Sequence, residues 1–219
     1  MSPRILFEHE LEELQRNVIT MGELIEQVYD KLFEALENGD TENMHALVDN
    51  DRVINDMQHH IEAKCLTLIT RQQPVARDLR TVSAALKVVT DIERVGDHVS
   101  DMAELLLRMK MPRLADFSES LPHMIGAAKR IVTEAVEAFV NGNMEKAKEV
   151  IAYDDVIDDY FNRVKEDLVA DLKAGKNADD CIDVLMIAKY LERIGDHAVN
   201  IGEWAIFQET GSVDDVRLL

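Results

Sequence analysis

Acidic side chains at four-residue spacing are the feature of this sequence that could do chemistry. Two rows occur, ninety-nine residues apart: Glu93, Asp97 and Asp101, and then Glu192, Asp196 and Asn200. Residues four apart lie on one face of an α-helix, so the carboxylates within a row repel one another. A multivalent cation would relieve that repulsion, because each carboxylate offers two hard oxygen donors.

A second acidic set precedes each row and could form the opposite wall of a groove. It is Asp51 with Asn55 in the first copy and Asp154 with Asp158 in the second. In helical projection, both sets flank an apolar stripe. Each copy then has four carboxylates and one amide. This equal division favours metal sites formed within a copy, although sites formed from the acids of both copies stay open. The predicted metal ligands are Asp51, Asn55, Glu93, Asp97, Asp101, Asp154, Asp158, Glu192, Asp196 and Asn200.

The type of donor limits the choice of metal. Oxygen ligands suit Mg²⁺, Ca²⁺, Mn²⁺ or iron better than zinc or copper. Carboxylates about 6 Å apart along a helix axis can also bridge two ions. The competing explanation is that these acids form ordinary solvated faces of an acidic helical protein. Their recurrence at matching places in both copies favours the metal site.

The residues beside the acidic rows have simpler explanations. His98 and His197 each follow an aspartate by one position, so they project about 100° away from most of the row. We therefore expect a structural role for both histidines. Gly96 and Gly195 lie between the apolar stripe and the acids, where a missing side chain permits close helix packing.

The acidic rows belong to an internal duplication that covers most of the chain. The segment "ALENGDTENMHALVDNDRVIND" aligns with "AFVNGNMEKAKEVIAYDDVIDD" at an offset of 103, and "IERVGDH" aligns with "LERIGDH" at an offset of 99. A unit that occurs twice indicates a repeat architecture. We expect the first repeat to cover residues 1–112 and the second to cover residues 113–219.

Each repeat has the pattern of three helices. They are expected at 7–37, at 41–69 and, after a loop or kink marked by Pro74, up to about residue 109, and then at 117–141, 144–173 and 179–207. The dividing segments "NGD" and "NGN" suit helix ends and turns. The low content of proline and aromatic residues also favours helix. We expect an all-α protein of two tandem antiparallel three-helix bundles, either as separate domains or as one six-helix body.

Charge and hydropathy restrict the partners and the location of the chain. A net charge of −19 over 219 residues argues against binding to nucleic acid or anionic lipid. No apolar run approaches the roughly 20 residues that a membrane span needs, and the N-terminal segment lacks the apolar core of a signal peptide. We expect a cytoplasmic protein without membrane insertion, whose protein partners could hold it at the inner membrane.

The two "ER(V/I)GDH" motifs, the acidic rows and the segment "RQQPVARDLR" at 71–80 together resemble the PhoU family of phosphate-signalling regulators. The resemblance extends over about residues 10–207. It implies the PhoU-like six-helix fold and a non-enzymatic homodimer or higher homo-oligomer. It implies negative regulation of phosphate-starvation signalling and phosphate uptake, through the phosphate-specific ABC transporter ATPase and a phosphate sensor histidine kinase. It also implies multinuclear binding of metal ions (iron, manganese, magnesium or zinc) at the acidic motifs.

Two other classes of function compete with this interpretation. A di-metal carboxylate oxidase or metal-storage bundle needs a Glu-x-x-His pair on each of two helices, pointing into the core. In this sequence only Glu42 and His45 have that spacing among the candidate helices. The third class is a helical scaffold that binds no metal. Nothing in the sequence supports hydrolytic or nucleophilic catalysis, since it has neither a glycine-rich phosphate loop nor a nucleophile elbow.

Overall fold

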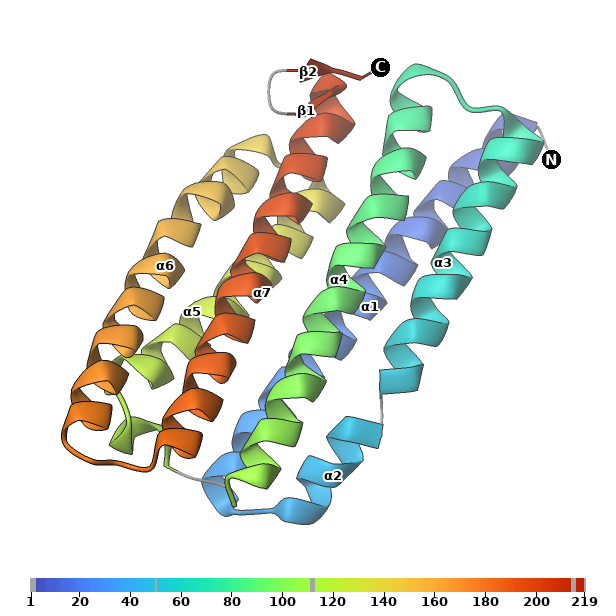
Figure 1. Ribbon diagram of the computed structural model, residues 1–219. Coiled ribbons are helices and arrows are strands. Elements are labelled where there is room, and N and C mark those ends of the chain that lie inside the picture. Colours follow the sequence, from blue (N-terminus) through green and yellow to red (C-terminus); the bar gives the residue numbers. More distant parts are fainter. Residues whose placement is uncertain (1–2, 50, 111–112, 214–215, 219) are drawn as a thin grey trace.

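The computed structural model describes residues 3–49, 51–110, 113–213 and 216–218, and most of this part of the chain is α-helical (Figure 1). The helices are α1 (Pro3–Asn38), α2 (Thr41–Asp49), α3 (Asp51–Gln72), α4 (Ala76–Arg108), α5 (Ser120–Asn141), α6 (Met144–Lys173) and α7 (Ala178–Thr210). A 3-10 turn η1 (Leu114–Asp116) precedes α5. The prediction of an all-α fold is confirmed. Within the described ranges, no helix is long and apolar enough to cross a membrane.

The ends of two equivalent helices follow from the turn residues in the sequence. Gly39 and Gly142 end α1 and α5 with φ angles of 66° and 60°, in the left-handed region that glycine adopts without steric cost. Asp40 and Asn143 come next, and the side chain of each accepts a hydrogen bond from a backbone N–H three residues later. The same turn chemistry therefore occurs once in each repeat.

Two details differ from the sequence prediction. The helix expected over 41–69 is instead two helices, α2 and α3, on either side of residue 50. Each of the two buries apolar residues of its own, such as Met44 in α2 and Ile61 in α3. Two short antiparallel strands, β1 (Ser212–Val213) and β2 (Val216–Arg217), follow α7. The reversal begins at Gly211, whose φ is 79° and whose carbonyl accepts a hydrogen bond from the N–H of Leu218.

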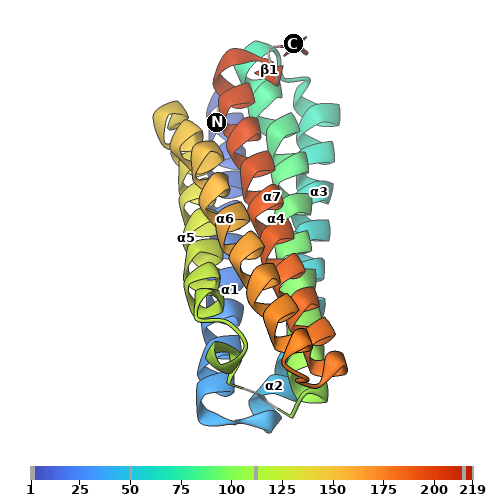
Figure 2. The ribbon, with the colours of Figure 1, turned by 60° about the vertical axis from the view of Figure 1, so that its left-hand side comes forward.

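The two repeats form one continuous body. Helices α1 to α4 pack together, as do α5 to α7, and the two groups meet where α4 packs against α7 and α1 packs against α5. Figure 2 shows all the long helices running side by side. The expected boundary after residue 112 falls at residues outside the described part, so it stays a prediction.

Helices α4 and α7 run antiparallel, and polar contacts join them at both ends. Arg108 near the end of α4 forms an ion pair with Asp183 near the start of α7. At the opposite end, Arg80 donates hydrogen bonds to the backbone carbonyls of Gln208 and Glu209. These carbonyls belong to the last turn of α7, where they have no partner within the helix. The basic segment at 71–80 thus supplies a cap for α7.

Tyr29 provides a test of core packing. Its side chain is fully buried, and its hydroxyl has no hydrogen-bond partner in the described part of the protein. A buried polar group without a partner costs about 1–3 kcal/mol. We therefore expect Tyr29→Phe to raise the free energy of unfolding by about 1 kcal/mol, measured by urea denaturation followed by circular dichroism.

Tyr190→Phe is the matched control for this experiment. The Tyr190 hydroxyl donates a hydrogen bond to the Asp101 carboxylate, so its removal is expected to lower stability. A loss of stability in both variants would contradict the assignment of Tyr29 as a residue with an unsatisfied hydroxyl.

Candidate metal site

In the second repeat, four predicted ligands lie on two neighbouring helices. Asp154 and Asp158 are on α6, and Glu192 and Asp196 are on α7, which packs beside it. Gly195 makes room between them, since a Cβ atom at this position would lie 2.5 Å from Oδ1 of Asp154. Because Gly195 has no side chain, the carboxylate of Asp154 on α6 can lie directly against the backbone of α7.

Two carboxylates of this cluster, those of Asp154 and Asp196, have raised pKa values. Burial, together with the negative charges of Asp158, Asp196 and Glu192, raises the pKa of Asp154 to about 6. The pKa of Asp196 is also raised, first by burial and then by Glu192. Lys189 forms an ion pair with Glu192 and offsets part of the negative charge. The cluster still holds an excess of negative charge that a cation would relieve.

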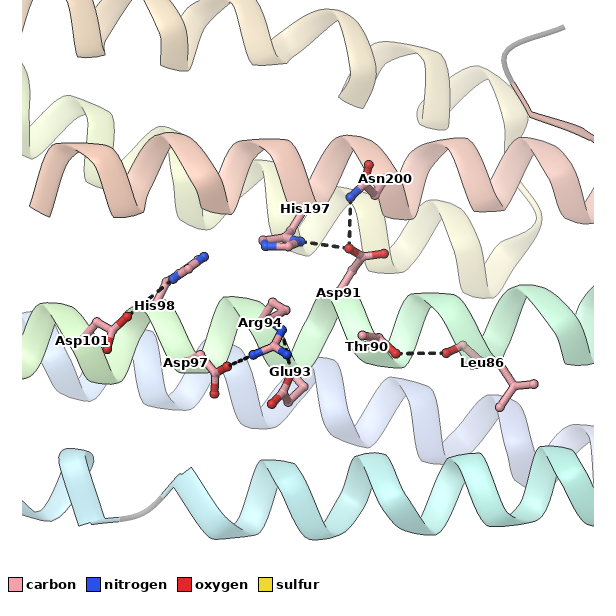
Figure 3. Close-up of polar contacts among 10 residues, drawn as sticks. All are labelled: Leu86, Thr90, Asp91, Glu93, Arg94, Asp97, His98, Asp101, His197 and Asn200. Atoms are coloured by element: carbon pink, nitrogen blue, oxygen red, sulfur yellow. Dashed lines mark hydrogen bonds and ion pairs between the residues drawn. The ribbon is translucent and has the colours of Figure 1, made fainter. Parts of the chain in front are cut away.

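The first repeat arranges its acidic residues differently. The Arg94 guanidinium lies between Asp97 and Glu93 on α4, at 2.6 Å from Asp97 Oδ2 and 3.6 Å from Glu93 Oε2 (Figure 3). Asn55 is half-buried on α3, and the side chain of Asp51 lies outside the described part of the structure. Arg94 already compensates much of the charge that a metal ion would neutralise here.

The glycines at matching positions each lie against an isoleucine of the neighbouring helix, Ile54 on α3 for Gly96 and Ile157 on α6 for Gly195. A Cβ atom on Gly96 would lie 3.0 Å from Cδ1 of Ile54 and 3.2 Å from Cδ1 of Ile25. In the first repeat the glycine therefore faces core isoleucines. In the second repeat, Gly195 faces the carboxylate of Asp154, with Ile157 beside it.

The last member of each row faces the other repeat. Asp101 accepts its hydrogen bond from Tyr190 on α7, and Asn200 Nδ2 donates to Asp91 Oδ1 on α4 at 3.1 Å. The cause is helical geometry: each step of four residues turns about 40° around the axis, so the third member is about 80° from the first. The structure therefore does not bring Asp101 or Asn200 together with the other predicted ligands.

Sequence reasoning missed a polar cluster between α4 and α7. His197 Nδ1 lies 2.9 Å from Asp91 Oδ1, while His98 stacks on Tyr190 with ring centroids 5.3 Å apart. Figure 3 shows Asp91 and His98 pointing from α4 toward α7. Asp91 and Tyr190 occupy equivalent repeat positions, ninety-nine residues apart, and this offset was the one available signal. The equivalence is hard to recognise in the sequence because one repeat has a charged residue at this position and the other has an aromatic one.

The two histidines lie in this interface, and His98 Nδ1 is 3.7 Å from Oδ2 of Asp101, the last member of the first acidic row (Figure 3). Their rings are 5.6 Å apart, and His98 is buried. Burial, followed by the neighbouring His197, lowers the pKa of His98 to about 4. His98 is therefore neutral near pH 7. Its Nδ1 atom has no hydrogen-bond partner in the described ranges.

The donor chemistry of the second repeat fits a hard divalent cation, but the carboxylates do not converge on one point. Across the described residues, no group of three or more His, Cys, Asp or Glu side chains is arranged to hold a metal ion. The fit rests on four oxygen ligands, on the space left by Gly195 and on the raised pKa of Asp154. Binding would require the side chains of this cluster to turn toward one another.

Comparison with known families gives a match over both repeats. The model of the PhoU domain matches residues 18–106 and 121–205, one match in each repeat. The chain belongs to the PhoU family. The family that the duplicated motifs suggested from the sequence is therefore confirmed.

Curated relatives and solved structures cover nearly the whole chain. The "phosphate-specific transport system accessory protein PhoU homolog" of Clostridium acetobutylicum is 37% identical over 98% of this chain and 99% of its own length. A homologue from Methanothermobacter thermautotrophicus is 32% identical over 95% and 96%. The crystal structure of the Streptococcus pneumoniae regulatory protein PhoU matches with a TM-score of 0.88 and 29% identity, covering 96% of this chain and 100% of that one. PhoU from Pseudomonas aeruginosa matches with a TM-score of 0.86 and 29% identity, over 94% and 100%.

The pKa of Asp154 predicts how its replacement changes stability. Because the folded pKa is raised to about 6, the charged carboxylate destabilises the folded state above pH 6, and this effect disappears as the pH falls to the ordinary value of 3.8. In the presence of a chelator, we expect Asp154→Asn to unfold at higher denaturant concentration than the unsubstituted protein at pH 7.5. At pH 4 the two should coincide.

Asp159→Asn is the control, because Asp159 is exposed on the same helix. It should leave the midpoint almost unchanged at both pH values. A lower midpoint for Asp154→Asn at pH 7.5 would show that the Asp154 carboxylate stabilises the folded protein and is not crowded by its neighbours.

Proposed function

We propose that this chain is a regulator of phosphate transport. The observation that carries the proposal is its full-length similarity to relatives described as accessory proteins of the phosphate-specific transport system. The similarity extends through both repeats and both chain ends, so it is not limited to one motif. The fold adds support, because its six long helices match solved PhoU structures along almost their whole length.

We further propose the direction of regulation and its partners. The chain restrains phosphate-starvation signalling and phosphate uptake when phosphate is plentiful. It acts on the phosphate-specific ABC transporter ATPase and on a sensor histidine kinase, from the cytoplasmic side and as a homodimer or higher homo-oligomer. The net charge of −19 supports recognition of basic protein surfaces rather than of nucleic acid.

The carboxylates between α6 and α7 support a role for a metal ion in this regulator. We propose that Asp154, Asp158, Glu192 and Asp196 hold a divalent cation such as Mg²⁺, Mn²⁺ or Fe²⁺, which would neutralise the cluster and offer open coordination positions to a partner. The crowded carboxylate of Asp154 is the main support. The set in the first repeat, Asp51, Asn55, Glu93 and Asp97, remains a second proposed site, with Arg94 as a competitor for its acids.

The alternative of a di-metal oxidase or metal-storage bundle finds no support in the geometry. Glu42 and His45, the one Glu-x-x-His pair considered, are both exposed on α2. Carboxylate-bridged di-metal sites of that class lie inside the bundle, where they are shielded from water. A regulator without enzymatic activity remains our proposal.

Metal binding can be tested one repeat at a time. We expect isothermal titration with Mn²⁺ to detect binding to the unsubstituted protein. The variant Glu192→Gln with Asp196→Asn should bind at least about tenfold more weakly, because two of the four carboxylates lose their charge. Glu93→Gln with Asp97→Asn tests the first repeat in the same way.

Two exposed acids serve as the control for charge alone. The variant Asp159→Asn with Glu166→Gln removes the same net charge from α6 and should keep the affinity for Mn²⁺. Equal weakening in this control would mean that Mn²⁺ responds to the overall charge of the protein and that the cluster is not a metal site.

The regulatory role can be tested in a bacterium that lacks its own PhoU-family gene. We expect expression of this chain to restore repression of a phosphate-starvation reporter when phosphate is plentiful. The Glu192→Gln, Asp196→Asn variant should restore less repression at equal protein level. Full expression of a folded chain without any repression would contradict the proposed function, whatever the metal measurements show.

A further inference from the structure

His98 and His197 occupy equivalent positions in the two repeats, and their side chains meet between α4 and α7. They are ninety-nine residues apart in the sequence, within the two copies of the same motif. Their ring centroids lie 5.6 Å apart, with an angle of 36° between the ring planes. The packing of α4 against α7 therefore brings one imidazole from each repeat to the same place.

A carboxylate faces the Nδ1 atom of each ring. Asp91 Oδ1 lies 2.9 Å from His197 Nδ1, and Asp101 Oδ2 lies 3.7 Å from His98 Nδ1. An ionised carboxylate only accepts hydrogen bonds, so Asp91 holds the proton of His197 on Nδ1. Asp101 is too far from His98 for a hydrogen bond, but its charge favours a proton on the same nitrogen. In both rings the lone pair is then on Nε2.

The two Nε2 atoms lie where one ion could bind both. In Figure 3, Nε2 of each ring lies on the side that faces the other ring. Among the described residues, neither atom has a hydrogen-bond partner. A metal ion about 2.0–2.1 Å from an imidazole nitrogen is about 3 Å from the ring centroid, so two ligating rings have centroids about 5–6 Å apart. The separation of His98 and His197 falls in this range.

Neighbouring side chains hold the two rings in place. Tyr190 stacks on His98, with ring centroids 5.3 Å apart. The Asp91 carboxylate that faces His197 also accepts a hydrogen bond from Asn200 Nδ2 at 3.1 Å, so this carboxylate is itself fixed. Histidines that bind metal in proteins almost always donate their second N–H to such a carboxylate, carbonyl or water. The two rings are therefore oriented before an ion binds.

The charges around the rings favour a cation. Apart from the two carboxylates and His197, the charged groups that act on His98 are Arg193, Arg94 and Asp97. Arg94 and Asp97 form an ion pair with each other, so their charges largely cancel. Arg193 is exposed, and its long side chain can turn into solvent. The two carboxylates then leave an excess of negative charge beside the rings, which attracts a positive ion.

We propose that the Nε2 atoms of His98 and His197 bind one divalent ion such as Zn²⁺, Ni²⁺ or Cu²⁺, which joins the two repeats. Imidazole nitrogen suits these ions, whereas carboxylate oxygen suits Mg²⁺ and Mn²⁺. The histidine site therefore differs in chemistry from the carboxylates between α6 and α7. Water completes the coordination, since the described ranges hold no group of three or more His, Cys, Asp or Glu arranged around one ion.

Nitrogen NMR of protein labelled with ¹⁵N-histidine identifies the ligating atoms directly. Zn²⁺ is added in a buffer with excess Mg²⁺, which competes for carboxylate sites. We expect one equivalent of Zn²⁺ to shift the Nε2 signals of two of the seven histidines, while the Nδ1 atoms of these two keep their protons. The protein with Zn²⁺ should also unfold at a higher urea concentration, because the ion binds only the folded chain.

Single substitutions assign the two shifted signals. His98→Gln and His197→Gln should each lower the affinity for Zn²⁺ by at least about tenfold and leave the other histidine unshifted, because one imidazole alone binds weakly. His59→Gln with His60→Gln removes two exposed histidines of α3 and should keep both the affinity and the shifts.

Circular dichroism would verify the fold of each variant. If His98→Gln does not fold, His197→Gln carries the test, since the His197 side chain is the more exposed of the two, 22% against 11%.

Three results would overturn the proposal. They are the absence of any histidine shift, shifts confined to exposed histidines such as His59 and His60, and unchanged affinity for Zn²⁺ in a folded His98→Gln or His197→Gln variant. None of these results bears on the Mn²⁺ titration or on the reporter assay, so a failure here is distinct from a failure of the proposed function.

Discussion

The antiparallel packing of α4 against α7 is the constraint on which the rest of this structure depends. It joins the two repeats along their central helices, and its middle is a cluster of polar side chains rather than an apolar layer. Asp91 accepts from His197 and Asn200, and Tyr190 takes the equivalent position opposite Asp101. Because one flank of each central helix faces the other repeat, the remaining flank, with the acids, faces α3 or α6.

The same duplication leads to different electrostatics in the two halves. In the first repeat, Arg94 lies against the acids of its own helix. In the second, the carboxylate of Asp154 lies against Gly195, and burial together with the surrounding negative groups raises its pKa. Crowded carboxylates lower the stability of the folded chain. Such a cost is common where a site binds a cation, and this is why the second repeat is the stronger candidate for metal.

The two repeats differ less in sequence at buried positions than at exposed ones. Positions that both repeats bury stay apolar, as at Ile92 and Leu191, because close packing tolerates few changes. Positions nearer the surface are less constrained, so the exposed Ile182 stands where the first repeat has the half-buried Ser83.

The sequence by itself determined the helical fold and the duplication, because these follow from periodicity and from turn residues such as Gly39 and Gly142 that act within a few residues. The family was indicated by its resemblance in the duplicated motifs. It also indicated that acids of α6 and α7 would share one flank. Only the tertiary structure decided that Asp101 and Asn200 face the other repeat, and that Arg94 rather than open space lies beside Asp97. A helical projection gives the direction of a side chain around its own axis. Which neighbour lies in that direction depends on how α4 and α7 pack, and residues about a hundred positions apart decide that packing.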